Sequence, residues 1–421
     1  MGGGDGLSGM DRTGAGWHWL CGGPILEHLK NSMRILHVIP TLDPATGGPT
    51  EVVRVLLSYG PEDYMQEVVT LDDPEAPFLR QVAFPVHALG PRTSVYGLNR
   101  KLLPWLRANR TRFDGVIVHG MWQYTGYAVW RSMGGRVPYA VFPHGMLDPY
   151  FKHAFPRKHM KKWLYWLAAE YWVLRYASRV LFTCEAEAEL AKQSFWLHRW
   201  HACVTPFGTI PPAGDPEAQR EAFFAACPAA RRRRFLLFLG RIDRKKGCDL
   251  LVDAFVKLAA RDPELDLVMA GPDPQCWRAE LERGAKAAGV AARIHWPGML
   301  LGGAKWGAFH ATEAFVLPSH QENFGIAVAE ALACSKPVLL SDKVNIAAEI
   351  AADGAGLMEA DTAAGTERLL VRWITLPPAG REAMAIRAHE CFHCRYDMRE
   401  NAKTVVKLFG MSNVEARGRD D

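Results

Sequence analysis

The sequence has no run of apolar residues long enough to cross a membrane, because its longest runs fall far short of the ~20 residues that a spanning helix needs. It has no Gly-x-x-x-x-Gly-Lys-Ser/Thr motif, which excludes a P-loop. It has no Asp-x-Asp, so one common carboxylate grip for a divalent metal is missing. A basic start followed by an unbroken apolar run is also missing, which argues against a secretory signal.

Disulfides and an excess of one charge are not expected either. The nine cysteines are an odd number and are scattered, which suits a reducing cytosol better than a disulfide framework. The densest group, His389, Cys391, His393 and Cys394, has no second pair at zinc spacing, and we expect neither a metal nor a cofactor. Fifty Lys and Arg stand against 45 Asp and Glu, and a net charge of +5 on 421 residues gives no argument for nucleic-acid binding.

What is present is the composition of an ordinary globular protein, with 49% apolar and 23% charged residues. The length predicts at least two domains, at roughly 100 to 200 residues each. Residues 1–32 are glycine-rich at their start and unlike the rest, so we expect a disordered extension, or a misplaced start with Met33 as the true first residue. We expect a first domain over 33–205, a second over 206–394, and a C-terminal helix and tail over 395–421.

Strand-like runs alternate with helix-like runs along most of the chain. The predicted strands cover 34–39, 67–71, 115–119, 138–143, 180–183, 235–239, 265–270, 293–296, 314–317 and 337–341. Most are short apolar blocks, as expected for parallel strands that are buried on both faces. Pro and Gly residues interrupt the series at 205–212. The pattern therefore predicts an α/β protein with two doubly wound parallel sheets joined by a hinge.

Ligands of such sheets bind beyond the carboxyl ends of the strands, so the loops that follow strands are the candidate sites. The first loop holds Gly47 and Gly48 before a helix, where the backbone can approach an anion closely; a plain strand-to-helix turn is the alternative. This loop does not match the Gly-x-Gly-x-x-Gly of nicotinamide-binding proteins. The second loop places His144 directly after a strand, where its ring can contact a sugar hydroxyl unless its role is structural. His119 ends another strand and is expected near the same cleft.

The third and fourth loops belong to the second domain. Arg241 offers a planar fork for two phosphate oxygens and Lys246 offers a point charge, although a solvated basic turn is the alternative. Glu322 and Glu330 stand eight residues apart, before and inside a helix expected to begin near 324–325. Eight helical residues rise ~12 Å, so the two carboxylates cannot form a close acid/base pair but can hold two ends of an extended ligand.

These motifs resemble those of the retaining glycosyltransferases of family 4, whose GT-B fold has two Rossmann-like domains facing across a cleft. The resemblance rests on Glu322 and Glu330 with their flanking segments 318–319 and 336–338, on the basic loop 240–247, and on the order of Gly47-Gly48 and His144-Gly145. It runs from about Met33 to the C-terminus. Segment 143–149 resembles a bacterial exopolysaccharide and colanic-acid-type branch. Pro206-Phe207-Gly208 stands where Pro-Asn-Gly is common, a departure expected to affect linker geometry rather than chemistry.

The resemblance implies a role for each matching residue. Arg241 and Lys246 would bind the donor diphosphate, Glu330 the ribose hydroxyls and Glu322 the transferred sugar. Catalytic roles would fall to His144, Glu322, Arg241 and Lys246. Donor binding would involve Gly47, Gly48, Arg241, Lys246, Met299, Leu300, Asn323, Phe324, Gly325 and Glu330, with Met299 and Leu300 beside the base.

The activity that the resemblance implies is transfer, with retention, of a sugar from a nucleoside-diphosphate sugar to a glycan or lipid-linked acceptor in cell-surface polysaccharide biosynthesis, without a metal. A sugar-nucleotide epimerase of the same fold and a catalytically silent binding or scaffold subunit are the alternatives. The complete set of Arg241, Lys246, Glu322 and Glu330 argues against silence. The resemblance also implies that a C-terminal helix near 395–408 packs on the first domain.

Basic and aromatic residues interleave over 152–172, which suits an anionic membrane surface. A solvated basic face over a large core is the alternative, and no DNA- or RNA-binding motif is present. Met160, Leu164, Leu167, Tyr171 and Leu174 form one helical stripe that we expect in the core. We expect a cytoplasmic protein, with peripheral contact with the inner face of the plasma membrane as a hypothesis.

Overall fold

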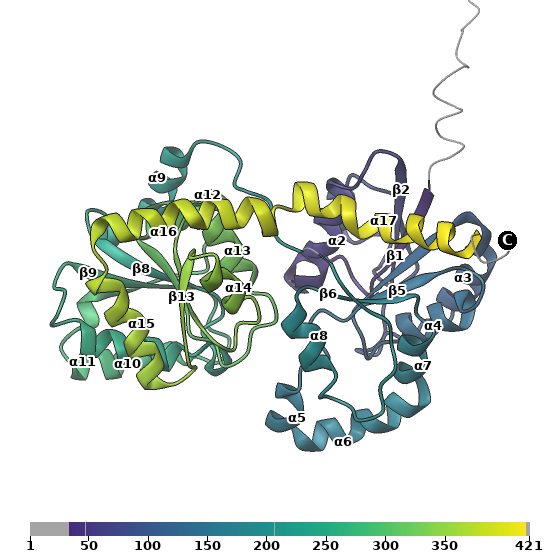
Figure 1. Cartoon of the computed structure of the whole chain (residues 1–421), viewed down its shortest axis with the longest axis horizontal. Helices are drawn as coiled ribbons and strands as arrows, with labels where there is room; N and C mark the ends of the chain where they lie inside the picture. Colours follow the sequence, from purple (N-terminus) through teal and green to yellow (C-terminus); the bar gives the residue numbers. More distant parts are fainter. Residues whose placement is uncertain (1–32, 47, 206, 418–421) are drawn as a thin grey trace, which may run out of the picture. The chain divides into compact units, whose positions relative to one another are not determined.

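The computed structural model describes residues 33–46, 48–205 and 207–417. The predictions made for residues 1–32, for Gly47 and for Pro206 lie outside the described residues. The prediction of an α/β protein with two doubly wound parallel sheets is confirmed (Figure 1). Among the described residues, no helix has the length and apolarity needed to span a bilayer.

The first domain is built on a seven-stranded parallel sheet with the order β3-β2-β1-β4-β5-β6-β7. Its strands are β1 (Met33–Val38), β2 (Tyr64–Thr70), β3 (Val86–Ala88), β4 (Gly115–His119), β5 (Tyr139–Phe142), β6 (Arg179–Phe182) and β7 (Ala202–Val204). Its α-helices are α2 (Gly48–Ser58), α3 (Leu102–Asn109), α4 (Tyr124–Met133), α5 (Tyr150–Ala154), α6 (Pro156–Tyr165), α7 (Tyr171–Arg175) and α8 (Glu185–Ala191). The short helical turns are η1 (Pro44–Thr46), η2 (Pro77–Gln81), η3 (Arg110–Arg112) and the π-helical η4 (Trp166–Glu170).

The second domain is built on a six-stranded parallel sheet with the order β10-β9-β8-β11-β12-β13. Its strands are β8 (Arg234–Leu239), β9 (Leu265–Ala270), β10 (Ile294–Gly298), β11 (Ala314–Leu317), β12 (Val338–Ser341) and β13 (Gly356–Glu359). Its helices are α9 (Pro216–Ala226), α10 (Cys248–Leu258), α11 (Arg278–Ala287), α12 (Gly302–Ala311), α13 (Ile326–Ala333), α14 (Ala347–Ala352), α15 (Ala363–Thr375) and α16 (Pro378–Cys391). The short turns are η5 (Pro228–Ala230), η6 (Arg244–Lys246), η7 (Ala291–Arg293) and the π-helical η8 (Phe392–Tyr396), and α17 (Met398–Arg417) ends the described chain.

The sequence did not predict three of the strands, and each of these three is an edge strand of its sheet. β3 and β7 end the first sheet and β13 ends the second. An edge strand is covered on fewer sides, and β3 and β7 have no fully buried residue, whereas the central β4, β9 and β11 are buried at every position. The apolar-block signal therefore identified the central strands and the edge strand β10, and it missed the other three edge strands.

The prediction that Met160, Leu164 and Leu167 belong to the core is wrong. Their exposed fractions are 71%, 76% and 50%, whereas Trp166 is fully buried and stacks on Phe195 with ring centroids 4.1 Å apart. The π-helical turn η4 lies between α6 and α7, so no single 3.6-residue period continues through the segment. The large indole ring takes the buried position, and the aliphatic stripe is left at the surface.

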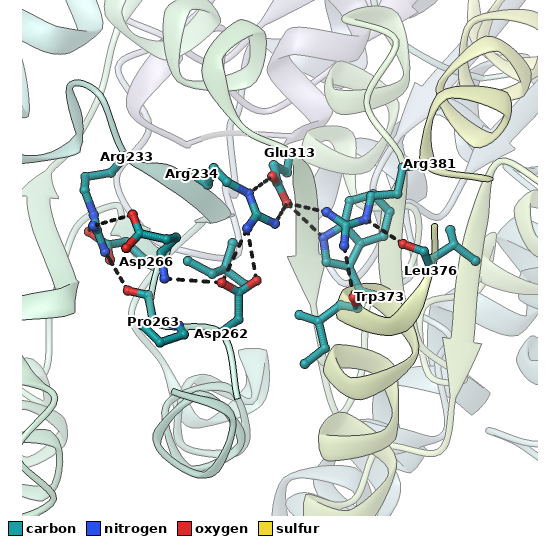
Figure 2. A network of polar contacts seen from close by, with 12 residues as sticks. Arg233, Arg234, Asp262, Pro263, Asp266, Glu313, Trp373, Leu376 and Arg381 are labelled. Atoms are coloured by element: carbon teal, nitrogen blue, oxygen red, sulfur yellow. Dashed lines mark hydrogen bonds and ion pairs between the residues drawn. The ribbon is translucent and has the colours of Figure 1, made fainter. Parts of the chain in front are cut away.

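A network of charged residues lies at the amino ends of the strands of the second sheet (Figure 2). Glu313, just before β11, accepts hydrogen bonds from the Nε of Arg234 at 2.5 Å and the Nε1 of Trp373 at 3.3 Å, and Arg381 approaches it at 3.4 Å. Arg233 forms a second group with the buried Asp266 at 2.7 Å. These contacts connect β8, β9, β11, α15 and α16 at the amino ends of the strands. The carboxyl ends of the same strands remain available to a ligand.

Two segments cross where the chain passes from one domain to the other. Thr209 donates its N–H to the carbonyl of Tyr396 at 3.0 Å, and Met398 donates to the carbonyl of Thr209 at 3.1 Å. A Cβ on Gly208 would lie 1.7 Å from that same Tyr396 oxygen, so the crossing requires glycine. Beyond it, α17 contacts α2, and the ring of the buried Phe409 lies against Gly115 of β4.

Candidate functional site

A cavity of about 380 Å³ lies at the carboxyl ends of β8, β9, β10 and β11. Seven of the residues predicted from the sequence line it: Arg241, Lys246, Met299, Leu300, Glu322, Gly325 and Glu330. We call it the donor cavity. It combines cationic, carboxylate and apolar walls, the composition expected of a site for an extended, partly charged ligand.

The cationic wall comes from the loop after β8. The Arg241 side chain is exposed at the cavity and has no hydrogen bond or ion pair with any residue that the structure describes. The Nζ of Lys246 forms an ion pair with Glu322, and both side chains are largely buried. Gly247 has a φ of 65°, and a Cβ there would lie 2.1 Å from the carbonyl oxygen of Pro318, so only glycine lets the basic loop pack on the loop before Glu322.

Glu330 forms the second anionic point of the cavity. It lies in α13, which begins at Ile326, one to two residues later than the sequence suggests, after Gly325 with a φ of 77°. Burial raises the pKa of Glu330, and Lys305 opposes the shift by donating to its Oε1 at 2.6 Å. The sequence analysis did not identify Lys305, because no known spacing motif links two residues that stand 25 positions apart.

The two glutamates therefore belong to two separate ion pairs. Glu322 pairs with Lys246 from the loop after β8, whereas Glu330 pairs with Lys305 from α12. This agrees with a helix rise that keeps the two carboxylates apart. Met299 and Leu300 follow β10 on the apolar wall; Met299 is 63% exposed and Leu300 is buried.

A second cavity of about 270 Å³ continues from the first, because both are lined by Glu322, Gly325 and Ile326. Its remaining lining residues include Gly48, His144, Thr183, Phe207, Asn323 and Phe324. We call it the sugar cavity, because the resemblance found in the sequence implies a sugar beside Glu322 and His144. The structure thus brings together every predicted site residue that it describes, while the position of Gly47 lies outside the described residues.

The His144 loop is held in a left-handed backbone conformation, with φ values of 51° at His144 and 76° at Gly145. The N–H of Gly145 donates to the buried carboxylate of Glu187 at 2.8 Å, and Glu187 also accepts from the backbone and hydroxyl of Thr183. A Cβ on Gly145 would lie 2.7 Å from Asn323, so the glycine permits close packing on the second domain. The sequence analysis did not identify Glu187. This residue lies at the start of the helix that follows β6, close to the carboxyl end of that strand, where ligands are expected to bind.

His144 is half-buried beside Phe142, whose ring centroid lies 4.2 Å away. Burial lowers the pKa of His144 to about 3, so the ring is neutral at pH 7. It can accept or donate one hydrogen bond toward a hydroxyl, but it brings no positive charge to the site.

Phe207 shows that the unusual Pro-Phe-Gly of the linker does touch the site. It lines the sugar cavity and packs edge-on against Phe324, with ring centroids 4.7 Å apart. From the sequence, the replacement of the common Pro-Asn-Gly by Pro-Phe-Gly was expected to affect only the geometry of the linker. In the structure, Phe207 also lines the sugar cavity.

A third cavity, of about 290 Å³, lies within the first domain beside the sugar cavity. Pro49 borders both, and the others that line it include Thr41, Thr46, Arg92, His119 and Gln123. We call it the hydroxyl-rich cavity. His119 thus lies next to His144, as its strand-end position suggested, with ring nitrogens 3.1 Å apart.

Metal ligands do not gather at these cavities. Within 33–46, 48–205 and 207–417, no group of three or more His, Cys, Asp or Glu side chains could hold a metal ion.

Comparisons with known proteins agree with this geometry in both domains. A family model described as glycosyl transferase 4-like domain matches residues 47–208, and one described as glycosyl transferases group 1 matches residues 219–389. The chain is 30% identical to a D-inositol 3-phosphate glycosyltransferase of Actinosynnema mirum, over 51% of this chain and 52% of that protein. It is 28% identical to a mannosylfructose-phosphate synthase of Agrobacterium fabrum, over 40% of this chain and 38% of that protein. The chain thus spans about half or less of these relatives.

Solved structures show the same fold at low sequence identity. Anabaena HepE in complex with UDP-glucose has a TM-score of 0.67 at 17% identity, covering 90% of this chain and all of that one. A glycosyltransferase from Rickettsia africae has a TM-score of 0.70 at 13% identity, covering 90% of this chain and 98% of that one. With both domains matched by glycosyltransferase models, the comparisons support placing this chain among the GT-B glycosyltransferases of the family 4 type.

Proposed function

We propose that this chain transfers a sugar from a nucleoside-diphosphate sugar to a hydroxyl acceptor, with retention of the anomeric configuration. The observation that carries the proposal is the continuity of the donor and sugar cavities through Glu322, Gly325 and Ile326. One part offers Arg241 and Lys246 to a diphosphate, and the next offers His144 and Asn323 to a sugar.

The donor would lie across the carboxyl ends of the second sheet. Its base would rest on Met299 and Leu300, its ribose hydroxyls would donate to Glu330, and its diphosphate would face Arg241 and Lys246. Lys305 donates to one carboxylate oxygen of Glu330, Oε1, and so compensates the buried group, while Oε2 faces no cation of its own among the described residues. A nucleotide phosphate near Lys246 would compete with Glu322 for the ammonium and free that carboxylate for a sugar hydroxyl.

Departure of a nucleoside diphosphate places negative charge on its phosphate oxygens. Fixed cations that face those oxygens lower the barrier without reorganisation at the moment of reaction. Arg241 and Lys246 would supply the charge, and the N–H groups at 323–325 would add dipoles. For a retaining transfer, the acceptor would attack the same face that the diphosphate leaves, and the leaving phosphate would take the acceptor proton.

The acceptor would enter through the hydroxyl-rich cavity, which adjoins the sugar cavity at Pro49. A glycan or a lipid-linked glycan in cell-surface polysaccharide synthesis is the acceptor class that we propose. The exposed Met160, Leu164 and Leu167 support contact with a membrane, because they lie beside the exposed Lys158 and Lys161. Apolar side chains flanked by cations suit an anionic bilayer surface.

Two measurements test the proposal. A thermal-shift panel of UDP-, GDP- and ADP-sugars should give a clear shift with one nucleotide class. Product analysis with that donor should then show a new glycoside only when acceptor is present, with NMR showing the donor's own anomeric configuration. Conversion of donor without acceptor would indicate an epimerase, and binding without turnover would indicate a silent subunit; either result rejects transferase activity.

A further inference from the structure

A row of three histidines crosses the first sheet and ends at the sugar cavity. His37 on β1 meets His119 at the end of β4 with Nδ1 and Nε2 3.0 Å apart, and the Nδ1 of His119 lies 3.1 Å from the Nε2 of His144. At the far end, the Oε1 of Gln66 on β2 lies 2.9 Å from the Nε2 of His37. Successive rings are stacked, with centroids 5.2 and 5.4 Å apart.

The row has a direction, because each neutral imidazole has one N–H donor and one lone-pair acceptor. The amide oxygen of Gln66 can only accept, so His37 donates from Nε2 and must accept at Nδ1. His119 then donates from Nε2 and accepts at Nδ1, and His144 donates from Nε2. Burial lowers the pKa of all three rings, to about 4 for His37 and about 3 for His144, so none is charged at pH 7.

This order of donors and acceptors determines the protonation of the remaining ring nitrogen of His144, Nδ1. Its Nδ1 is left with a lone pair and has no hydrogen-bond partner among the residues that the structure describes. We propose that Gln66, His37 and His119 are positioning residues that fix the tautomer of His144, so that its Nδ1 accepts a hydrogen bond from a hydroxyl of the donor sugar. This proposal rests on the proposed function for the identity of the ligand, but the tautomer itself does not.

The tautomer can be read directly by NMR of the intact protein labelled with ¹⁵N-histidine. Long-range ¹⁵N–¹H correlations separate Nδ1-protonated from Nε2-protonated rings, and His144→Gln, His119→Gln and His37→Gln assign the signals. We expect all three rings to be neutral and protonated at Nε2 at pH 7. An Nδ1-protonated His144, which a reversed Gln66 amide would produce, overturns the proposal whether or not the protein binds a sugar nucleotide.

Substitution of Gln66 tests the coupling. Gln66→Leu removes the anchoring oxygen, whereas Gln66→Glu keeps an oxygen acceptor, and Gln81→Leu is a control at an exposed position of the same domain. We expect Gln66→Leu to leave His144 as a mixture of tautomers and to weaken binding of UDP-glucose or GDP-mannose about tenfold, with binding of UDP or GDP unchanged. Gln66→Glu should restore both readouts. An unchanged His144 spectrum and donor affinity in Gln66→Leu would overturn the coupling. A protein that binds no UDP-, GDP- or ADP-sugar refutes the proposed function and leaves the tautomer result standing.

Discussion

At the scale of single residues, the charged side chains of the donor cavity have partners from distant parts of the sequence. Lys246 pairs with Glu322, and Lys305 pairs with Glu330, so each carboxylate is matched by one cation. Arg241 alone has no partner among the described residues, which leaves its fork available to an anion. This arrangement keeps buried charges compensated before a ligand arrives.

Removing the cations of the donor cavity should abolish most of the activity. We expect Arg241→Ala and Lys246→Ala each to lower kcat by about 100-fold or more, because each removes a fixed charge from the departing diphosphate. Arg244→Ala is the matched control, since Arg244 belongs to the same loop but contacts Trp277 and Glu280. Steady-state kinetics with the donor identified by thermal shift would measure the effect. Undiminished activity in both variants, or loss on chelation that magnesium restores, would contradict the proposal.

The buried histidines predict an acid-sensitive fold. In the unfolded chain each imidazole takes up a proton near pH 6.5, whereas burial lowers the pKa of His37 to about 4 and of His144 to about 3 in the folded protein. Between these values the unfolded state binds more protons, so the free energy of unfolding falls as pH is lowered from about 6.5 toward 4. For each histidine, the free energy of unfolding can fall by at most about 1.4 kcal/mol per pH unit.

Urea titrations at pH 6.5 and 5.0 would measure this loss. His119→Gln should show a smaller loss than the wild type, because one group with a lowered pKa is gone. His201→Gln, at an exposed position of the same domain, should behave as the wild type. Equal losses in His119→Gln and the wild type would show that other groups dominate.

At the scale of elements, the π-helical turn η4 determines which side chains of the segment 156–175 are buried and which are exposed to solvent. It buries Trp166 and turns Met160, Leu164 and Leu167 outward. The exposed surface thus combines aliphatic side chains with the cations of α6, which are Arg157, Lys158, Lys161 and the less exposed Lys162. No acidic residue lies between 149 and 169 to oppose an anionic surface.

The membrane contact can be tested with vesicles. We expect the wild type to float with liposomes that contain an anionic phospholipid, and the double variant Met160→Ser, Leu164→Ser to bind at least tenfold more weakly, because it removes apolar area from the contact. Ile386→Ser on α16 of the second domain, also an exposed aliphatic position, is the control. Absence of wild-type binding to anionic and neutral vesicles alike would remove the proposed contact.

The ion-pair layer around Glu313 is expected to serve stability alone (Figure 2). Glu313→Gln weakens the contacts with Arg234, Trp373 and Arg381 and should lower the free energy of unfolding by about 2 kcal/mol. Donor affinity should not change, because the layer lies at the opposite edge of the sheet from the donor cavity. Glu367→Gln, which breaks one exposed pair with Lys257, should cost less than about 0.5 kcal/mol. Urea denaturation and nucleotide titration would measure the two effects, and a weakened donor affinity would contradict the separation.

At the scale of the whole molecule, the last helix returns to the first domain. α17 contacts α2, and Phe409 is buried against Gly115 of β4. The chain therefore passes twice between the domains, once before Thr209 and once after Tyr396, and the two passages are hydrogen-bonded to each other.

Truncation of the Phe409 ring should therefore destabilise the fold. We expect Phe409→Ala to lower the free energy of unfolding by about 3 kcal/mol, because it opens a cavity beside β4. Lys407→Ala, at an exposed position of the same helix, should change it by less than about 0.5 kcal/mol. Urea denaturation would measure both, and equal stability of the two variants would show that α17 adds little to the first domain.

The sequence alone determined the sheet class, the central strands and the loops that carry the cavity residues. It could do so because central parallel strands are apolar on both faces and because ligands bind at their carboxyl ends, both of which are local patterns. The tertiary structure decided what local patterns do not contain: the pairing of Lys305 with Glu330, the support of the His144 loop by Glu187, the row from Gln66 to His144, and the outward turn of the 160–167 stripe. These depend on side chains that are far apart in the chain, or on one inserted helical turn, and only the packing of the sheets and helices fixes either.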